Sequence, residues 1–335
     1  MRALVLRADA GEAKLQVEDV GEPSPADGDV LVQSLALGVC GTDRKLAQRL
    51  PRTAAGRESL ILGHESLGRV LEAPAGSGLR AGDLVAGIVR RPDPQPCAYC
   101  AAGEFDMCDN GGYVERGISG RDGYGAERYR VESDYAVRVD PALGLAGVLL
   151  EPASIVAKAW ERVERLAPRQ PGRVLIVGAG PIGLLAALLA VQRGHEIHVL
   201  DRVASGVKVR RAEELGAVYH AGPGTVPGGF DVVLECSGAL EAEAVGWASP
   251  SGVVCLLLPR LPAGGVPLGN RAVIGTVNSN RRHFEQAAAA LLAADRPWLD
   301  GLLGPLVPLE DWRLAFDVGP DAIKAVIDLG VDDTL

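Results

Sequence analysis

The stretch VLIVGAGPIGLLAALLAV at Val174–Val191 decides the fold of the second half of this chain. A short β-branched run is followed by Gly178, Gly180 and Gly183, and then by an Ala/Leu-rich segment. Its length of about 18 apolar residues would suit a membrane helix, but three glycines and Pro181 divide it. The pattern therefore predicts a strand, a glycine-rich turn and a helix, an arrangement that places a nucleotide pyrophosphate at the helix amino end.

The sequence on both sides continues this alternation of short apolar and amphipathic runs. A helical pattern over Ile155–Leu166 precedes the stretch, and strand–helix alternation extends from Arg173 to about Val277. Such alternation is typical of a doubly wound parallel sheet, so this half is predicted to be an α/β, Rossmann-type domain. The expected strands are Val174–Val177, Ile197–Leu200, Val218–His220, Val232–Glu235 and Val253–Leu257, and the expected helices include Pro181–Arg193 and Val207–Leu215.

The glycine turn and the end of the second strand predict how a dinucleotide is held. Besides the glycines, Pro181 and Ile182 open the helix that would meet the pyrophosphate. Asp201 ends the second strand about 23 residues after the first glycine, where an acid hydrogen-bonds the adenosine ribose and disfavours a 2′-phosphate. Asp201 makes NAD the expected cofactor, and Arg202, which follows it, leaves NADP as the alternative. Cys236, in the ECSG stretch that ends a later strand, should border the same pocket.

The first ~150 residues, about the length of one domain, have a different texture. Short strands at Val30–Leu35, Glu65–Glu72 and Leu84–Ile88 are separated by Gly/Pro-rich turns, and another turn is expected at Ala10–Gly11. This pattern indicates an all-β, partly open barrel, on which the tail from about His283 folds back. We therefore predict a catalytic domain of residues 1–153 and 284–335 and a dinucleotide-binding domain of residues 154–283.

The composition excludes several classes of function. A net charge of −9 over 335 residues argues against nucleic-acid binding and against an anionic membrane surface, because both need clustered Lys and Arg. The amino terminus lacks the cationic and apolar regions of a signal peptide. The six cysteines lie in one loop, one metal-type motif and two apolar strands, a distribution typical of a reducing compartment. We expect a soluble, cytoplasmic protein.

Two short motifs in the first half bring metal-binding residue types together. Gly38–Asp43 (GVCGTD) supplies Cys40, and Gly63–Glu65 (GHE) supplies His64 and Glu65. Thiolate, imidazole and carboxylate are ligands that suit a tetrahedral zinc ion. A catalytic zinc has three protein ligands and one open position, so these residues predict a catalytic metal.

Two further residues belong to this candidate site. Glu151, followed by Pro152, lies where the predicted barrel meets the dinucleotide-binding domain, so it would face the cleft between them. Thr42 lies two residues beyond Cys40, and a local turn would hold its hydroxyl beside whatever the metal binds. Taken singly, each residue also has an ordinary structural interpretation, and their joint occurrence is what favours zinc.

Together these motifs resemble the zinc-dependent medium-chain dehydrogenase/reductase superfamily. GVCGTD, GHE, the AGD turn at Ala81–Asp83, the late Glu-Pro and GAGPIG carry the resemblance over essentially the whole chain. Within the superfamily the chain is most similar to archaeal-type glucose 1-dehydrogenases. This narrower match rests on GVCGTDR at Gly38–Arg44, IVRRP at Ile88–Pro92, ERGISGRDGYGAE at Glu115–Glu127, LLEPASIVAKAW at Leu149–Trp160 and TVNSNRRHF at Thr276–Phe284.

The resemblance implies a GroES-like catalytic barrel with a zinc that takes part in hydride transfer. Cys40 and His64 would bind the zinc, and Glu65 and Glu151 would complete the site, Glu151 also lying against the substrate. Zinc lowers the pKa of bound water from about 15.7 to about 7, and a bound sugar hydroxyl would be acidified in the same sense. Thr42 would take the hydroxyl proton.

The resemblance also assigns residues around the substrate and the nicotinamide. Lys45 would pass the proton onward, although an exposed lysine is more often only solvated. Glu115 and His283 would hydrogen-bond sugar hydroxyls, and Asn278 would lie near the nicotinamide. Val89 stands where relatives can carry an asparagine before the paired arginines, which removes one sugar contact.

A second group of cysteines lies in the loop that PDPQP opens. Cys97 and Cys100 are separated by two residues, a spacing that lets both thiolates face one ion, and Cys108 follows after seven more. Related dehydrogenases carry four cysteines here around a structural zinc, and the first of them is missing. The candidates for the fourth ligand are Asp93, Asp106 and Asp109. The other interpretation is a zinc-free loop with three thiols.

The sequence therefore predicts an oxidoreductase that transfers hydride from the C1 hydroxyl of a glucose-like aldose to NAD(P) and gives a lactone. One alternative is a polyol or secondary-alcohol dehydrogenase on the same scaffold. Another is a non-catalytic zinc- and dinucleotide-binding module that senses redox state. A homodimer or homotetramer is expected, with subunits pairing through the edge of the Val253–Leu257 strand.

Overall fold

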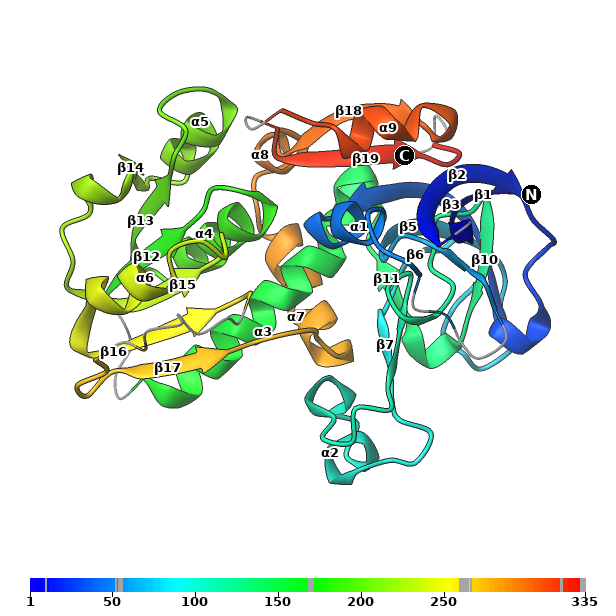
Figure 1. Cartoon of the computed structure of the whole chain (residues 1–335), viewed down its shortest axis with the longest axis horizontal. Helices are drawn as coiled ribbons and strands as arrows, with labels where there is room; N and C mark the ends of the chain where they lie inside the picture. Colours follow the sequence, from blue (N-terminus) through cyan, green and yellow to red (C-terminus); the bar gives the residue numbers. More distant parts are fainter. Residues whose placement is uncertain are drawn as a thin grey trace.

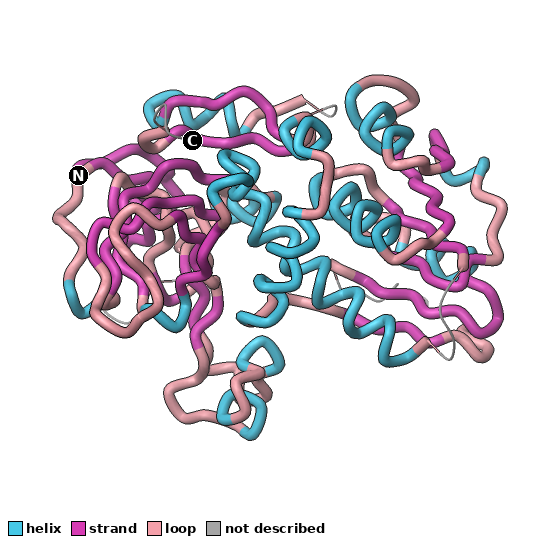
Figure 2. Tube along the Cα trace, turned by 180° about the vertical axis from the view of Figure 1, so that it is seen from behind, coloured by secondary structure: helices cyan, strands magenta, loops and turns pink. Residues whose placement is uncertain are grey.

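The computed structural model describes residues 1–9, 11–51, 53, 57–167, 172–258, 265, 267–319 and 322–331. Figure 1 shows a barrel lobe (residues 1–149 with 303–328) and a sheet lobe (residues 173–275), with helix α3 (Leu150–Leu166) between them. A small cysteine projection (residues 92–112), which carries α2 (Ala98–Ala101), extends from the barrel lobe. Figure 2 shows from behind that strands fill one lobe while helices flank the sheet of the other.

In the described part of the chain, the sheet lobe contains six parallel strands in the order β14-β13-β12-β15-β16-β17. The order reverses between β12 and β15, and ligands of doubly wound folds bind at such a switch point. The strands are β12 (Arg173–Val177), β13 (Glu196–Asp201), β14 (Val218–Ala221), β15 (Phe230–Glu235), β16 (Ala248–Leu256) and β17 (Ala272–Gly275). The first five match the predicted strands in type and position.

Both faces of this sheet are covered because its strands are apolar on both sides. Ile176 faces the core that contains α4 (Pro181–Gln192) and α5 (Val207–Glu214). Its neighbour Val177 faces the opposite core, under α6 (Glu241–Trp247). Side chains alternate along a strand, so a continuous apolar run predicts a strand buried on both faces.

The prediction that the Val253–Leu257 strand forms the sheet edge is wrong. This strand lies between β15 and β17, with Val253 opposite Ala272 and Leu256 opposite Gly275. Among the described strands, β17 is the last on that side. It is four residues long, too short to give a clear periodic signal in the sequence.

The described residues of the barrel lobe form three sheets. The largest has the order β11-β6-β5-β3-β19-β18, with β10 also paired to β3, and the others are β2-β1-β4 and β7-β8-β9. The strands are β1 (Arg2–Asp9), β2 (Glu12–Asp19), β3 (Val30–Val39), β4 (Ser59–Ile61), β5 (Glu65–Glu72), β6 (Leu84–Gly87), β7 (Arg90–Arg91), β8 (Val114–Arg116), β9 (Gly120–Arg121), β10 (Arg128–Val131), β11 (Ala136–Val139), β18 (Leu303–Pro308) and β19 (Lys324–Asp328). The strands β1 and β2 flank the predicted turn at Ala10–Gly11, of which Ala10 lies outside the described residues.

The carboxyl-terminal segment returns to the barrel, as predicted. It passes through α7 (Arg281–Leu292), α8 (Arg296–Asp300) and α9 (Trp312–Phe316), and β19 then pairs antiparallel with β3. Val326 lies opposite Gly38, so the tail reaches the strand that leads to the GVCGTD motif. Helix and loop were expected here, and the strands β18 and β19 were not.

Helix α3 joins the two lobes without a break. The predicted domain boundary between residues 153 and 154 lies inside it, so the domain limits stay a prediction. The helical stretch Pro141–Leu166 passes the length and hydropathy test for a membrane span, but 83% of its most apolar window is buried inside the protein. One core cluster contains Leu67 of the barrel, Trp160 of α3 and Ile176 of the sheet, which identifies α3 as a core helix.

Candidate active site

Cys40, the first predicted zinc ligand, lies where β3 ends and α1 (Gly41–Leu46) begins. Its backbone N–H donates to Oδ2 of Asp43 at 2.8 Å, which closes a tight turn around the thiol. Thr42 is half-buried in the first turn of α1, beside Cys40 in sequence. Lys45 is exposed on the same helix and makes no side-chain hydrogen bond or ion pair within the described residues.

His64 is held in place by a carboxylate. Gly63 has a positive φ of 94°, which lets the chain turn immediately before β5. Oδ1 of Asp43 lies 3.2 Å from Nδ1 of His64, an arrangement that orients the ring and leaves its other nitrogen for a metal. Burial opposes a charge on His64, but Asp43 and Cys40 together raise its pKa well above the usual value. The sequence analysis missed Asp43, although the residue belongs to GVCGTD.

Glu65 completes a compact group of three candidate metal ligands, and its charge is paired with a residue far along the chain. The ligand atoms of Cys40, His64 and Glu65 all lie within 4.8 Å of one another. Nζ of Lys324 lies 2.5 Å from Oε2 of Glu65, and the two side chains are 2% and 1% exposed. Lys324 comes from β19, 259 residues further along the chain. Its only signal in the sequence is a lysine at the start of an apolar run.

Glu151 lies beside this group at the start of α3. Its burial raises its pKa to about 7, with the charges of His64, Glu65 and Lys324 also acting on it. A buried set of one thiolate, one imidazole and two carboxylates has the chemistry of a zinc site, and a cation there would offset the repulsion among its anions. The residues therefore fit the expected metal.

Glu115 and Asn278 were predicted separately and lie in contact. Nδ2 of Asn278 donates to Oε1 of Glu115 at 2.7 Å, and Nη2 of Arg90 donates to the same oxygen at 2.9 Å. Within the described residues, Oε2 of Glu115 accepts no hydrogen bond. Asn278 has a φ of 63° and is the one non-glycine residue with a positive φ in the described part of the chain. Asparagine tolerates this backbone better than most residues, and the sequence analysis missed Arg90.

His283 does not join this group. Its ring is fully buried at the start of α7, where Nδ1 accepts from the backbone N–H of Asn280 at 3.1 Å. Its Nε2 lies 3.3 Å from Oε2 of Glu161 and lines a cavity of about 270 Å³ between the cysteine projection, α3 and α7. Burial lowers its pKa to about 4. The sugar contact of His283 stays a prediction, since Asn280 engages Nδ1 while Nε2 has no hydrogen-bond partner among the described residues.

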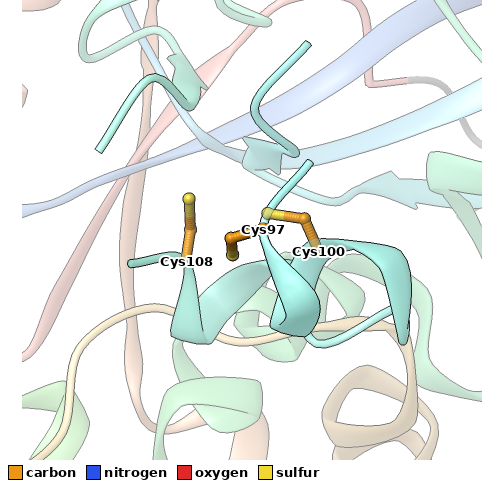
Figure 3. Close-up of side chains that lie close together, drawn as sticks. All are labelled: Cys97, Cys100 and Cys108. Carbon is orange, nitrogen blue, oxygen red and sulfur yellow. The ribbon is translucent and has the colours of Figure 1, made fainter. Parts of the chain in front are cut away.

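Figure 3 shows Cys97, Cys100 and Cys108 grouped in the cysteine projection. Their sulfur atoms lie within 4.8 Å of one another. Cys97 precedes α2, Cys100 lies in it, and Cys108 follows the short 3₁₀ turn Phe105–Met107. The backbone N–H groups of Cys100 and Asp109 lower the pKa of Cys97 to about 7. Burial raises the pKa of Cys100 to about 11, so it is the grouping of the three sulfur atoms that fits a metal ion.

The predicted fourth ligand is not with the sulfur atoms. Both carboxylate oxygens of Asp93 accept backbone N–H groups, from Gln95 at 2.8 Å and from Gly112 at 3.2 Å. Asp106 forms an ion pair elsewhere. No carboxylate or imidazole among the described residues joins the three sulfur atoms within 4.8 Å. The expectation that Asp93, Asp106 or Asp109 completes the set is therefore wrong for this structure.

The glycine turn of the sheet lobe fits a pyrophosphate. Gly178 has a φ of 99°, and a Cβ at Gly183 would lie 1.7 Å from the carbonyl oxygen of Gly178, so both positions require glycine. A Cβ at Gly180 would meet nothing within 4 Å, because the backbone there faces open space. Pro181 and Ile182 form the first turn of α4, whose amino end faces this space.

A pocket of about 520 Å³ extends from this turn along the carboxyl ends of the strands. Its lining includes Gly178, Gly180, Asp201, Arg202, Lys208 and Cys236. Lys208, from α5, was not predicted. The Cys236 thiol borders the pocket as expected, and burial raises its pKa well above the usual value.

Asp201 has a structural task besides its place in the pocket. Its Oδ2 accepts the backbone N–H of Ala179 at 2.7 Å, and its Oδ1 accepts the N–H groups of Arg202 at 2.7 Å and Val203 at 3.2 Å. The carboxylate thus fastens the glycine turn to the end of β13. It retains free lone pairs for a ribose, while Arg202 and Lys208 bring two cations to the same end of the pocket.

Comparisons with known proteins agree with this arrangement. Residues 144–329 match the family described as "Glucose dehydrogenase C-terminus", and residues 26–141 match the "Alcohol dehydrogenase GroES-like domain". The chain is 38% identical to glucose 1-dehydrogenase of Methanocella arvoryzae, with 94% of this chain and 96% of that protein covered. It is 37% identical to glucose 1-dehydrogenase of Thermoproteus tenax, with 98% and 99% covered.

Solved structures give the same result. Glucose dehydrogenase from Haloferax mediterranei superposes with a TM-score of 0.89 at 30% identity, covering 99% of this chain and 100% of that one. The same enzyme in complex with NADP, Zn and gluconolactone superposes with a TM-score of 0.88 at 31% identity, covering 98% and 99%. Our chain therefore belongs to the glucose dehydrogenases of the zinc-dependent medium-chain dehydrogenase/reductase superfamily.

Proposed function

We propose that this enzyme oxidises the C1 hydroxyl of a pyranose aldose, with glucose as the leading substrate, and transfers the hydride to NAD(P)⁺. The product is the corresponding lactone. The observation that carries the proposal is one chain that combines the Cys40–His64–Glu65 group, the Glu115–Asn278 contact and the glycine-turn pocket. The relatives named glucose 1-dehydrogenase, and the Haloferax complex with NADP, Zn and gluconolactone, support it.

The residues of the site have complementary tasks in this reaction. Cys40 and His64 would hold the zinc, with Glu65 and Glu151 completing its surroundings. When bound, the zinc would acidify the sugar hydroxyl, and the nicotinamide would accept the hydride. The hydroxyl of Thr42 would accept the released proton.

The remaining residues would orient the sugar and release the proton to solvent. Oε2 of Glu115 would accept a hydrogen bond from a sugar hydroxyl, since Oε1 is already engaged by Asn278 and Arg90. Lys45, exposed on the helix that carries Thr42, would pass the proton to solvent.

For the cofactor, we propose use of both NAD and NADP. The Asp201 carboxylate repels a 2′-phosphate, while Arg202 and Lys208 attract one. The Asp201→Asn variant removes the charge and keeps one of the two oxygens that accept backbone N–H groups. It should raise the ratio of NADP to NAD efficiency about tenfold, equivalent to about 1.4 kcal/mol. A ratio unchanged from that of the parent enzyme would show that Asp201 does not discriminate.

The test of the function itself is initial-rate reduction of NAD and NADP, with zinc present, against glucose, galactose, xylose, sorbitol and ethanol. Turnover of an aldose with release of its lactone supports the proposal. Turnover restricted to sorbitol or ethanol would keep the scaffold chemistry and replace the substrate class with polyols or simple alcohols. Cofactor binding without turnover of any of them would favour the non-catalytic module.

We further propose that the three-cysteine cluster holds a structural zinc, with its fourth position left to a non-protein ligand. Zinc analysis should then give two ions per chain, and one ion would contradict it. A cytoplasmic homodimer or homotetramer remains our expectation for the assembled protein, and sedimentation analysis would measure its size.

A further inference from the structure

A buried ion pair outside the zinc and cofactor sites connects the cysteine projection to the substrate side. Lys158, in the middle of α3, places Nζ 2.7 Å from Oδ2 of Asp106, and the two side chains are 3% and 0% exposed. Desolvation largely offsets the attraction in such a pair, so its presence is weak evidence for a stabilising role. The contacts that the pair makes with other groups are therefore informative.

Those contacts hold the chain on both sides of Asn278. Nζ of Lys158 donates to the carbonyl of Val277 at 2.9 Å, and Oδ1 of Asp106 accepts from Nδ2 of Asn280 at 2.7 Å. Between them, Asn278 has its positive φ of 63°. A non-glycine residue in this region persists when its surroundings determine its conformation, and here the ion pair supplies two of the restraints.

The same short segment touches the proposed sugar and zinc residues. Asn278 donates to Oε1 of Glu115 at 2.7 Å. Oγ of Ser279 lies 2.7 Å from Oγ of Ser154, which donates in turn to the carbonyl of Glu151 at 2.6 Å. Residues 277–280 are thus fixed at four successive positions, by α3, by β8 and by the cysteine projection.

A second route leads from the ion pair to Glu115. The carbonyl of Asp106 accepts from Nη1 of Arg90 at 3.1 Å, and Nε and Nη2 of the same arginine donate to Oε1 of Glu115 at 3.2 and 2.9 Å. Oε1 is therefore held from two directions, through Asn278 and through Arg90. The first support rests on the side chains of the Lys158–Asp106 pair and the second on the main-chain carbonyl of Asp106. Oε2 accepts no hydrogen bond from the described residues.

We propose that Lys158 and Asp106 are positioning residues for sugar binding. They fix residues 277–280 and Arg90, which in turn present the Glu115 carboxylate to the substrate. This inference rests on the proposed function, because that function assigns Glu115 to the sugar. It also gives the cysteine projection a part in substrate binding, since Asp106 lies two residues before Cys108.

The first test is the Lys158→Met variant of the zinc-loaded enzyme. Loss of an interaction made equally in the ground and transition states raises KM and leaves kcat unchanged. We expect the KM for the sugar to rise about tenfold, with kcat nearly unchanged. A change of this size corresponds to the loss of one or two hydrogen bonds to the sugar. NADH affinity at the Asp201 end of the pocket should not change. Unchanged KM in the folded variant would overturn the proposal.

Two further variants separate positioning from folding. Lys158→Met with Asp106→Leu removes both charges, so it should regain thermal stability relative to the single variant while the sugar KM stays high. Recovery of KM together with stability would show that the pair is only structural. Arg165→Gln is the matched control, because Arg165 lies on the same helix with its side chain 64% exposed and an ion pair to Glu161.

Hydrogen exchange of residues 277–280 gives a readout that does not depend on the substrate. Exchange there should accelerate in Lys158→Met and in the double variant, and not in Arg165→Gln. If the parent enzyme oxidises no aldose, the proposed function fails while this readout still tests the positioning role. Unchanged exchange in both Lys158 variants would refute that role in either case.

Discussion

The two cysteine-containing clusters of this chain have similar dimensions and opposite surroundings. In each, three ligand atoms lie within 4.8 Å of one another. The Cys40–His64–Glu65 cluster is enclosed by side chains from distant parts of the chain, including Lys324 and Glu151. The cluster of Cys97, Cys100 and Cys108 spans twelve residues and is supported by backbone N–H groups. The first therefore depends on the whole fold, whereas the second assembles locally.

The histidines beside the two clusters show the same contrast. His64 lies against Asp43 and Cys40, and these anions raise its pKa although burial opposes the charge. His283, beneath the cysteine projection, is equally buried, yet there burial prevails and lowers its pKa to about 4. Both are buried beside anions, but only at His283 do neighbouring cations, Arg282 and Lys158, add to the effect of burial.

The largest expected difference between the clusters is in turnover. Cys40→Ser removes a ligand from the proposed reacting zinc and should lower kcat/KM by at least about 100-fold, the upper range for loss of a metal's supporting residue. Cys108→Ser should keep most of kcat, because its cluster offers no group to the reacting atoms, and any effect should appear in the sugar KM through Asp106. Both variants should lose one zinc per chain by elemental analysis. Equal loss of turnover in the two would end the division into catalytic and structural clusters.

The next largest effect concerns the buried counter-charge of the first cluster. Lys324→Met leaves the Glu65 carboxylate buried without its partner, which should lower the free energy of unfolding by about 3–5 kcal/mol. The matched control is Arg138→Met, whose side chain is 59% exposed beside Asp83 and whose loss should cost about 0–1 kcal/mol. Denaturant unfolding measures both. Because bound zinc would also offset the charge of Glu65, the deficit should be larger after a chelator removes the metal.

The same contrast separates what the sequence predicted from what it did not. Cys40 and His64 belong to GVCGTD and GHE, two motifs whose chemistry is visible within a few residues. Asp43, which the sequence analysis missed, lies in the first of them. The pairing of β19 with β3 places Lys324 in the site. No local sequence pattern predicts a partner for Glu65 that lies 259 residues away. The sheet strands were predictable because apolar runs and glycines are local signals, whereas β17 was too short to give one.

His283 and Asp93 show why residue type alone does not assign a role. Their residue types suited a sugar and a metal, and motif position suggested those roles. In the structure, Asn280 and Glu161 face the ring nitrogens of His283, and backbone N–H groups occupy both oxygens of Asp93. Backbone N–H groups satisfy both oxygens of Asp93, whereas Nε2 of His283 has no hydrogen-bond partner among the described residues. Both arrangements depend on loop conformations that composition does not specify.

The smallest expected effect follows from the lowered pKa of His283. Burial is its main cause, and Arg282 and Lys158 act in the same direction. The folded pKa of about 4 lies below the unfolded value of 6.5, so between these limits the unfolded chain binds more protons. The contribution of His283 to stability is therefore complete above pH 6.5 and is lost as the pH falls toward 4. His283→Gln should show a shallower decline than the parent over this range.

Denaturant unfolding of the zinc-loaded protein at a series of pH values measures this difference. Zinc loading matters because His64, as a metal ligand, then does not titrate. Glu132, whose pKa is lowered to about 2, adds to the slope only below its ordinary value of 4.5, and equally in both proteins. Parallel curves for the parent and His283→Gln would mean that Asp106 and Glu161 balance the effect of burial and leave the pKa of His283 unshifted. A steeper decline in His283→Gln than in the parent would mean that these carboxylates keep His283 protonated in the folded state. The two histidines would then behave alike, and the contrast between the clusters would rest on their metal ligands alone.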